Sequence, residues 1–120
     1  MTRAWTLLLA MACSGPQGDW VAVDAQQGDR ISVARGTLAI DRRGDTRLQL
    51  TLDGSGPTGA LEASGTSTPI DGAAELDLEG IWRLEGSELI VYVGGPCEGA
   101  VALTCELDVG GADWIVRFER

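Results

Sequence analysis

The amino-acid sequence predicts an all-β fold, an antiparallel meander of about eight strands that closes into a barrel or a partly closed barrel. Three observations support this prediction. Short apolar runs alternate with polar residues at period two, and 17 glycines gather mostly in turn-like clusters between those runs. After Cys13, no stretch keeps the apolar stripe of an amphipathic helix. The length of 120 residues fits a single such domain.

The clearest expected strands alternate over their whole length. Residues 47–53 and 101–108 follow this pattern, and residues 114–119 place Trp114, Val116 and Phe118 on one face. The other expected strands are residues 20–24, 31–35, 37–41, 73–77, 81–84 and 89–93. Residues 59–72, rich in Gly, Ser, Thr and Pro, fit a weak strand with a long loop, and this segment is the first candidate for a mobile lid.

The charge and the missing residue types exclude several function classes. The chain has 18 acidic residues and nine basic ones, giving a net charge of −9, so it offers no basic patch for a nucleic acid. It contains neither histidine nor lysine, which removes the commonest general base, the commonest zinc ligand and the amine nucleophile. We therefore expect no catalytic residues, no cofactor and no enzyme activity. The acidic surface suits a cationic partner, or it serves only solubility. We expect a monomer.

The first residues are typical of an export signal. Arg3 precedes an apolar run that is too short to span a bilayer, and the run ends in Ala10-Met11-Ala12-Cys13. This sequence resembles the lipobox of bacterial lipoproteins, although that family usually has Leu where Ala10 stands. The resemblance implies that Cys13 is diacylated through its sulfur, that the chain is cleaved before Cys13 and that the new amine is then acylated, palmitate included. It divides the chain into a signal peptide (1–12), a lipidated linker (13–18) and a barrel-like domain (19–120).

The alternative for this segment is a buried helix with Cys13 as a core thiol. Ser14-Gly15-Pro16-Gln17-Gly18 follows at once and suits no core helix, so the lipoprotein interpretation is favoured. Lipoproteins that stay in the inner membrane usually carry Asp after the cysteine. Ser14 therefore implies a lipid-anchored protein of the cell envelope, held at the outer membrane and facing the periplasm.

Lipidation of Cys13 leaves Cys97 and Cys105. An oxidising compartment would join these two cysteines in a disulfide, and two buried thiols are the alternative.

Gly18-Asp19-Trp20 resembles the G-x-W opening of lipocalins and lipocalin-like barrels. The resemblance implies that Trp20 closes one end of the barrel and that a basic residue of the last strands packs over it. Arg117 is the candidate, through a cation–π contact. The Thr-Asp-Tyr signature of the family is missing here, and the alternative is that Trp20 is an ordinary core aromatic.

Two further motifs are interpreted as structural. Residues 54–59 match G-x-G-x-x-G, but Pro57 and the tract after it form no helix to receive a pyrophosphate, so we expect a turn. Glu75, Asp77 and Glu79 share one strand face, which suits Ca²⁺ ligation or, more simply, a solvated surface. We expect no metal site.

These observations predict an envelope lipoprotein with a non-catalytic binding role, either for a small apolar ligand in the barrel or for a protein on its surface. Mostly aliphatic filling of the barrel would leave little affinity for a fatty acid or an apolar dye. One alternative resembles, in size, charge, tether and disulfide, the small β-barrel lipoproteins that inhibit lysozymes, and it would bind a cationic enzyme. A small enzyme that uses carboxylates is the other alternative.

Overall fold

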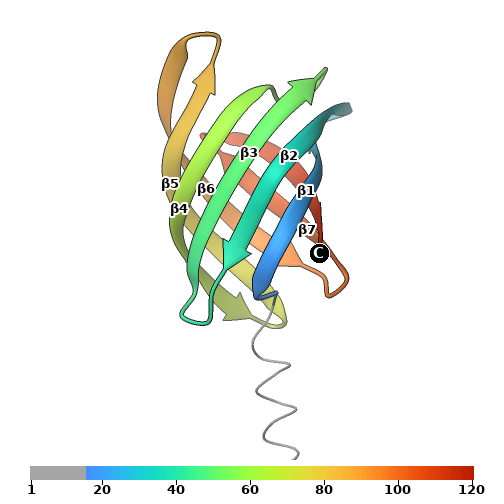
Figure 1. The fold of residues 1–120 in the computed structure, drawn as a ribbon, viewed down its shortest axis with the longest axis vertical. Helices are drawn as coiled ribbons and strands as arrows, with labels where there is room; N and C mark the ends of the chain where they lie inside the picture. Colours follow the sequence, from blue (N-terminus) through green and yellow to red (C-terminus); the bar gives the residue numbers. More distant parts are fainter. Residues whose placement is uncertain (1–15) are drawn as a thin grey trace, which may run out of the picture.

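The computed structural model describes residues 16–120, which form a closed barrel of eight antiparallel strands (Figure 1). Each strand pairs with the next along the chain, and β1 pairs with β8 to close the barrel. The strands are β1 (Gly18–Gln27), β2 (Arg30–Ile40), β3 (Asp45–Gly54), β4 (Gly59–Ile70), β5 (Ala73–Leu84), β6 (Ser87–Glu98), β7 (Ala102–Val109) and β8 (Ala112–Glu119). No helix within residues 16–120 is long and apolar enough to cross a membrane. The predicted signal peptide and Cys13 lie outside the described residues.

The predicted fold class is confirmed, but several strand boundaries were wrong. Residues 31–35 and 37–41 belong to the one strand β2, and residues 73–77 and 81–84 belong to β5. Most of the segment 59–72 is β4, which pairs with β3 and β5 along its length and is part of the barrel wall.

Glycines inside the strands explain these errors. A Cβ atom at Gly36 would collide with the carbonyl oxygen of Gln49, and one at Gly80 would collide with that of Glu62. Gly36 also has a φ of 128°, which disfavours other residues. Such glycines allow adjacent strands to approach closely where a small barrel coils sharply. The expected strands 31–35 and 37–41 stop and start beside Gly36, and the expected strand 81–84 starts beside Gly80.

Side chains fill the interior of the barrel. Trp20, Trp114 and Phe118 are almost completely buried, and Leu, Val and Ala from all eight strands complete the core. The filling is therefore mostly aliphatic, as the composition predicts. An eight-stranded barrel has an interior just wide enough for such filling.

One bulge changes the alternation of β1. The register of β1 shifts by one residue between Val21 and Asp24 against β2, and between Ala22 and Asp24 against β8. Ala22 and Ala25 therefore both face the core, while Val23 is exposed between them. Bulges of this kind increase the local twist of the strand.

Candidate functional site

The two ends of the barrel differ in how they are closed. We call one the Trp20 end: it carries Pro16, Trp20 and the β2–β3, β4–β5 and β6–β7 turns, and it is the lower end in Figure 1. We call the other the Trp114 end: it carries Trp82, Trp114 and the remaining four turns.

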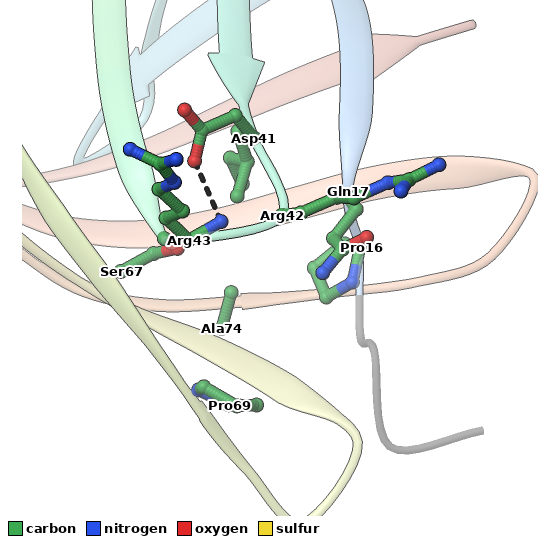
Figure 2. A pocket seen from close by; sticks show the side chains of 10 residues that line it. Pro16, Gln17, Asp41, Arg42, Arg43, Ser67, Pro69 and Ala74 are labelled. Atoms are coloured by element: carbon green, nitrogen blue, oxygen red, sulfur yellow. Dashed lines mark hydrogen bonds between the residues drawn. The ribbon is translucent and has the colours of Figure 1, made fainter. Parts of the chain in front are cut away.

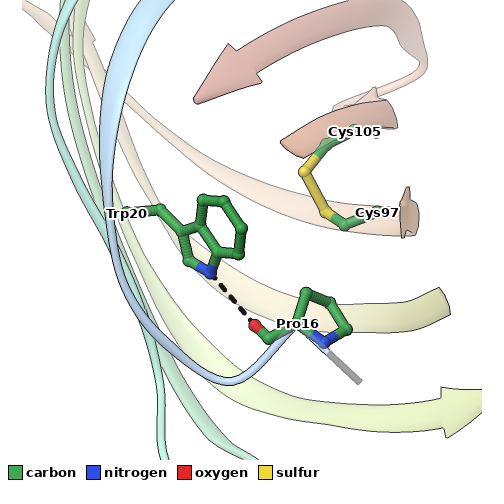
Figure 3. Close-up of a disulfide and its surroundings, with 4 residues drawn as sticks. All are labelled: Pro16, Trp20, Cys97 and Cys105. Atoms are coloured by element: carbon green, nitrogen blue, oxygen red, sulfur yellow. Dashed lines mark hydrogen bonds between the residues drawn. A yellow bond between two sulfur atoms is a disulfide. The ribbon is translucent and has the colours of Figure 1, made fainter. Parts of the chain in front are cut away.

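Trp20 closes its end from inside the barrel. Its side chain is fully buried, and its indole N–H donates a hydrogen bond to the carbonyl oxygen of Pro16 at 3.0 Å (Figure 3). This bond fixes the chain where it enters the barrel, because Pro16 is itself buried. The position of Trp20 is that implied by the lipocalin resemblance.

The basic residue over Trp20 is Arg120, so the assignment of Arg117 was wrong. The Arg120 guanidinium carbon lies 4.0 Å from the centroid of the Trp20 ring. The alternation of β8 could have identified it, because Trp114, Val116 and Phe118 face inward and position 120 continues their side. Arg117 points outward, and its Nε donates to Asp24 at 2.8 Å. This hydrogen bond and the charge of Asp24 raise the pKa of Arg117.

The predicted disulfide is confirmed at the same end. Cys97 of β6 and Cys105 of β7 are joined, with both residues fully buried and facing the barrel interior opposite Trp20 (Figure 3). The ladder between β6 and β7 is interrupted at Gly95 and Pro96, where proline supplies no N–H. The disulfide holds the two strands together just beyond that interruption.

A hollow of about 340 Å³ lies beside the entry of the chain at the Trp20 end (Figure 2). The carboxylate of Asp41 accepts hydrogen bonds from the backbone N–H groups of Arg43 at 2.8 Å and Asp45 at 2.9 Å, which fixes the β2–β3 turn. The side chains of Arg42 and Arg43 extend to opposite sides of this turn. They flank the hollow without converging in it. Its lining residues are Pro16, Gln17, Ile40, Asp41, Arg42, Arg43, Gly44, Ser67, Pro69 and Ala74.

The Trp114 end is closed by two indoles in edge-to-face contact. The centroids of Trp82 and Trp114 are 5.2 Å apart at an interplanar angle of 84°. The Trp82 N–H donates to the carbonyl oxygen of Thr58 at 2.9 Å. The buried Nε1 of Trp114 and the buried hydroxyl of Ser32 have no hydrogen-bond partner among residues 16–120. Burying a polar group without a protein partner costs free energy of folding.

The outer wall carries an unexpected apolar surface on β8, β1 and β2. In β1, Gln26 pairs with Ile31 of β2 on one side and with Ile115 of β8 on the other. Asp24 likewise pairs with Val33 of β2 and with Arg117 of β8. Exposed branched side chains surround these two polar residues. We call this surface the apolar face; it consists of Val21, Val23, Ile31, Val33 and Ile115.

Sequence reasoning missed the apolar face because Ile31 and Val33 look like core residues. In the structure Ser32 and Ala34 face the core instead. The inward positions of β2 follow from Leu38 by counting back two residues at a time, which gives positions 36, 34 and 32. This count requires that Gly36 be treated as part of the strand.

The opposite wall carries an acidic face, which consists of Glu75, Asp77, Glu79, Glu106 and Asp108 on the outer sides of β5 and β7. Tyr92 of β6 lies between them and is half exposed. A side-chain hydrogen bond to Asp77, followed by partial desolvation and the surrounding carboxylates, raises the pKa of Tyr92. Within residues 16–120, no three acidic or cysteine side chains gather closely enough to hold a metal ion.

The fold and the two closed ends define a class: a small, filled, eight-stranded antiparallel meander barrel, an architecture consistent with lipocalin-like barrels. Comparison with known protein families, curated proteins and solved structures finds no match for this chain.

Proposed function

We propose that this protein is a lipoprotein of the bacterial cell envelope, acylated at Cys13 and held at the outer membrane facing the periplasm, and that it binds a protein partner through the apolar face. The lipobox-like sequence before Cys13 supports the anchor, and the observation that carries the binding role is the exposure of five branched side chains on three adjacent strands. Val33 alone leaves 60% of its surface exposed. Contiguous apolar surface of this kind marks interaction sites on soluble domains.

The filled interior favours a partner on the surface over a small apolar ligand inside the barrel. Trp20 and Phe118 occupy the volume that a ligand would need, and the indole of Trp20 is held by its hydrogen bond to Pro16. A ligand would have to displace packed side chains from a core of near-crystalline density.

The charges within the apolar face also suit a protein contact. Arg117 and Asp24 form an ion pair there, so their charges offset each other. Val21, Val23 and Ile115 lie close to this pair along the β1–β8 ladder. A charged group that is already paired costs less to bury in a protein interface than an unpaired one.

Photo-crosslinking in the native host tests this contact. A photoreactive amino acid at Val33 should yield a defined crosslinked species, while the same amino acid at exposed Thr66 of β4 should yield none. Ile31→Glu, which places a charge beside the probe, should abolish the species. Equal crosslinking from Val33 and Thr66, or none from either position, would contradict the proposal.

The mass of protein extracted gently from host membranes tests the anchor separately. We expect a denatured mass equal to residues 13–120 plus acyl chains, with one disulfide. A full-length soluble chain that begins at Met1 would refute the anchor without bearing on the apolar face.

The acidic face supports a second candidate, inhibition of a cationic enzyme such as lysozyme. Its carboxylates lie on one wall, and opposite charge accelerates the encounter of two proteins. Binding should weaken steeply with added salt, because exposed charges are screened within about 8 Å at physiological ionic strength. Asp77→Asn with Glu79→Gln should reduce this binding, while Ile31→Glu should leave it unchanged. Salt-independent binding would exclude this candidate.

A further inference from the structure

The place where the chain enters the barrel limits how far the barrel can stand from a lipid at Cys13. Pro16 is buried and its carbonyl oxygen is held by the indole of Trp20. Only Ser14 and Gly15 separate it from Cys13. Three residue steps span at most about 11 Å, even when fully extended. A lipid on Cys13 therefore brings the Trp20 end to within head-group distance of the membrane.

We infer that the Trp20 end of the barrel rests on the membrane and that its turns contact anionic phospholipid head groups. This inference rests on the acylation of Cys13 proposed above. It adds an orientation, with the barrel axis upright on the membrane and the Trp114 end facing away, and it makes the turns of the Trp20 end a lipid-binding surface. We call these turns the rim: residues 41–44, 70–72 and 99–101.

The rim carries side chains that suit this contact. Arg42 and Arg43 are both exposed at the tip of the β2–β3 turn, one on each side of it (Figure 2). The nearest acid, Asp41, already accepts two backbone N–H groups of the same turn, so its carboxylate faces the turn. Adjacent cationic side chains beside a bilayer bind anionic head groups.

The two other rim turns present apolar side chains to the same side. Val101 in the β6–β7 turn is 84% exposed, and Ile70 at the β4–β5 turn is 50% exposed. Asp71 also lies in this rim, next to Ile70. Ile70 and Val101 supply the apolar part of this surface, and Arg42 and Arg43 supply its cationic groups, while Asp41 and Asp71 bring the formal charge of the rim to zero.

The turns of the Trp114 end have a different composition. Three of its four turns have the tips Gly28-Asp29, Glu85-Gly86 and Gly110-Gly111, and the β3–β4 turn, residues 55–58, has no charged side chain. An anionic membrane would repel the carboxylates of Asp29 and Glu85. In a chain of net charge −9, an anionic membrane therefore repels the turns of the Trp20 end less than those of the Trp114 end, and the proposed lipid at Cys13 holds the Trp20 end there.

A pair of fluorescent labels tests the orientation. Cys13 is acylated in this proposal and Cys97 is bridged to Cys105, so one introduced cysteine is the only free thiol. Val101→Cys labels the rim, and Ser87→Cys labels the opposite end. Each acylated, labelled protein is reconstituted into vesicles of phosphatidylethanolamine and phosphatidylglycerol that contain a head-group quencher. We expect strong quenching at residue 101 and little at residue 87.

Charge variants test the head-group contact. Arg42→Ala with Arg43→Ala should shift the ratio of docked to undocked barrel by about fivefold for each arginine, and quenching at residue 101 should fall accordingly. The control is Arg30→Ala with Arg35→Ala, which removes the same charge far from the rim and should leave the quenching unchanged. Vesicles of phosphatidylcholine alone should reproduce the loss seen with the Arg42 and Arg43 variant.

The outcomes separate this inference from the anchor on which it rests. An acylated protein whose two labels are quenched equally, or whose quenching ignores the rim arginines, would retain the anchor and overturn the docked rim. An unacylated chain by mass, with no vesicle binding, would overturn both. An acylated chain with selective quenching at residue 101 that depends on Arg42 and Arg43 would support both.

Discussion

Tryptophan side chains close both the Trp20 end and the Trp114 end of the barrel, yet the two ends differ in whether their buried polar atoms have hydrogen-bond partners. At the Trp20 end the buried indole N–H has an acceptor, Arg120 covers the ring, and a disulfide joins the strands nearby. At the Trp114 end the N–H of Trp114 and the hydroxyl of Ser32 are buried without a partner among residues 16–120.

This difference indicates where the barrel is most firmly held. Satisfied polar groups and a covalent link stabilise the end that the chain enters, whereas unsatisfied groups weaken the opposite end. Local opening begins where the free energy of opening is lowest. We therefore expect the barrel to open first at the Trp114 end, and the end that we propose to lie on the membrane to open last.

The largest expected effect concerns the disulfide. Cys97→Ala with Cys105→Ala should lower the free energy of unfolding by about 2.5 kcal/mol, because closing this short loop restricts the unfolded chain. Urea denaturation measures the change. Reduction of the native protein should give a similar loss, and the reductant should not affect the double variant. Equal stability of the oxidised protein and the double variant would show that the Trp20 end does not depend on its cross-link.

The next effect compares the two tryptophans directly. Trp20→Phe and Trp114→Phe remove the same ring atoms, so the difference between them isolates the polar contacts. Trp20→Phe leaves the Pro16 carbonyl without its donor and weakens the contact with Arg120, whereas Trp114→Phe removes an N–H that has no partner. Trp20→Phe should therefore cost about 2 kcal/mol more in urea denaturation. Equal losses would contradict the proposed asymmetry.

Two buried hydroxyls extend the comparison, because removing them should change the free energy of unfolding in opposite directions. The hydroxyl of Thr46, at the Trp20 end, donates to the carbonyl oxygen of Gly44 at 2.9 Å, whereas that of Ser32 has no partner. Thr46→Val should cost about 1 kcal/mol, and Ser32→Ala should gain about 1 kcal/mol. Thermal unfolding measures both, with Ser64→Ala on the exposed side of β4 as a neutral control. Destabilisation by Ser32→Ala would mean that this hydroxyl has a partner after all.

The fold was predictable from the sequence because alternation and glycine-rich turns act locally. The positions of the glycines inside strands were not, since Gly36 and Gly80 are required by the backbone of a neighbouring strand rather than by a turn. The sequence alone does not show at which glycines the backbone of a neighbouring strand approaches closely. The same limitation divided β2 and β5 into shorter strands.

Some features of the candidate sites could be predicted from the sequence, and others could not. Cys97 and Cys105 followed from counting cysteines and Trp20 from a short motif, so both could be predicted. The apolar face depends on the bulge at Val23 and on the register of β2, both of which are set by pairing across strands. Choosing Arg117 instead of Arg120 ignored the alternation of β8, which the sequence does contain.

The smallest expected effect on stability concerns Tyr92, which lies on the barrel wall between the two ends. Tyr92 is the only tyrosine, and its pKa is raised chiefly by the hydrogen bond to Asp77. From pH about 10 upward, the unfolded chain releases this proton while the folded protein still holds it. The contribution of Tyr92 to the free energy of unfolding should therefore be fully present below pH about 10 and be lost as the pH rises through the folded pKa. The absorbance of the phenolate should report the titration. Tyr92→Phe should remove this decrease, while Trp20→Phe and Trp114→Phe should keep it. A phenolate transition at the pKa of free tyrosine would show that Asp77 does not hold the Tyr92 proton.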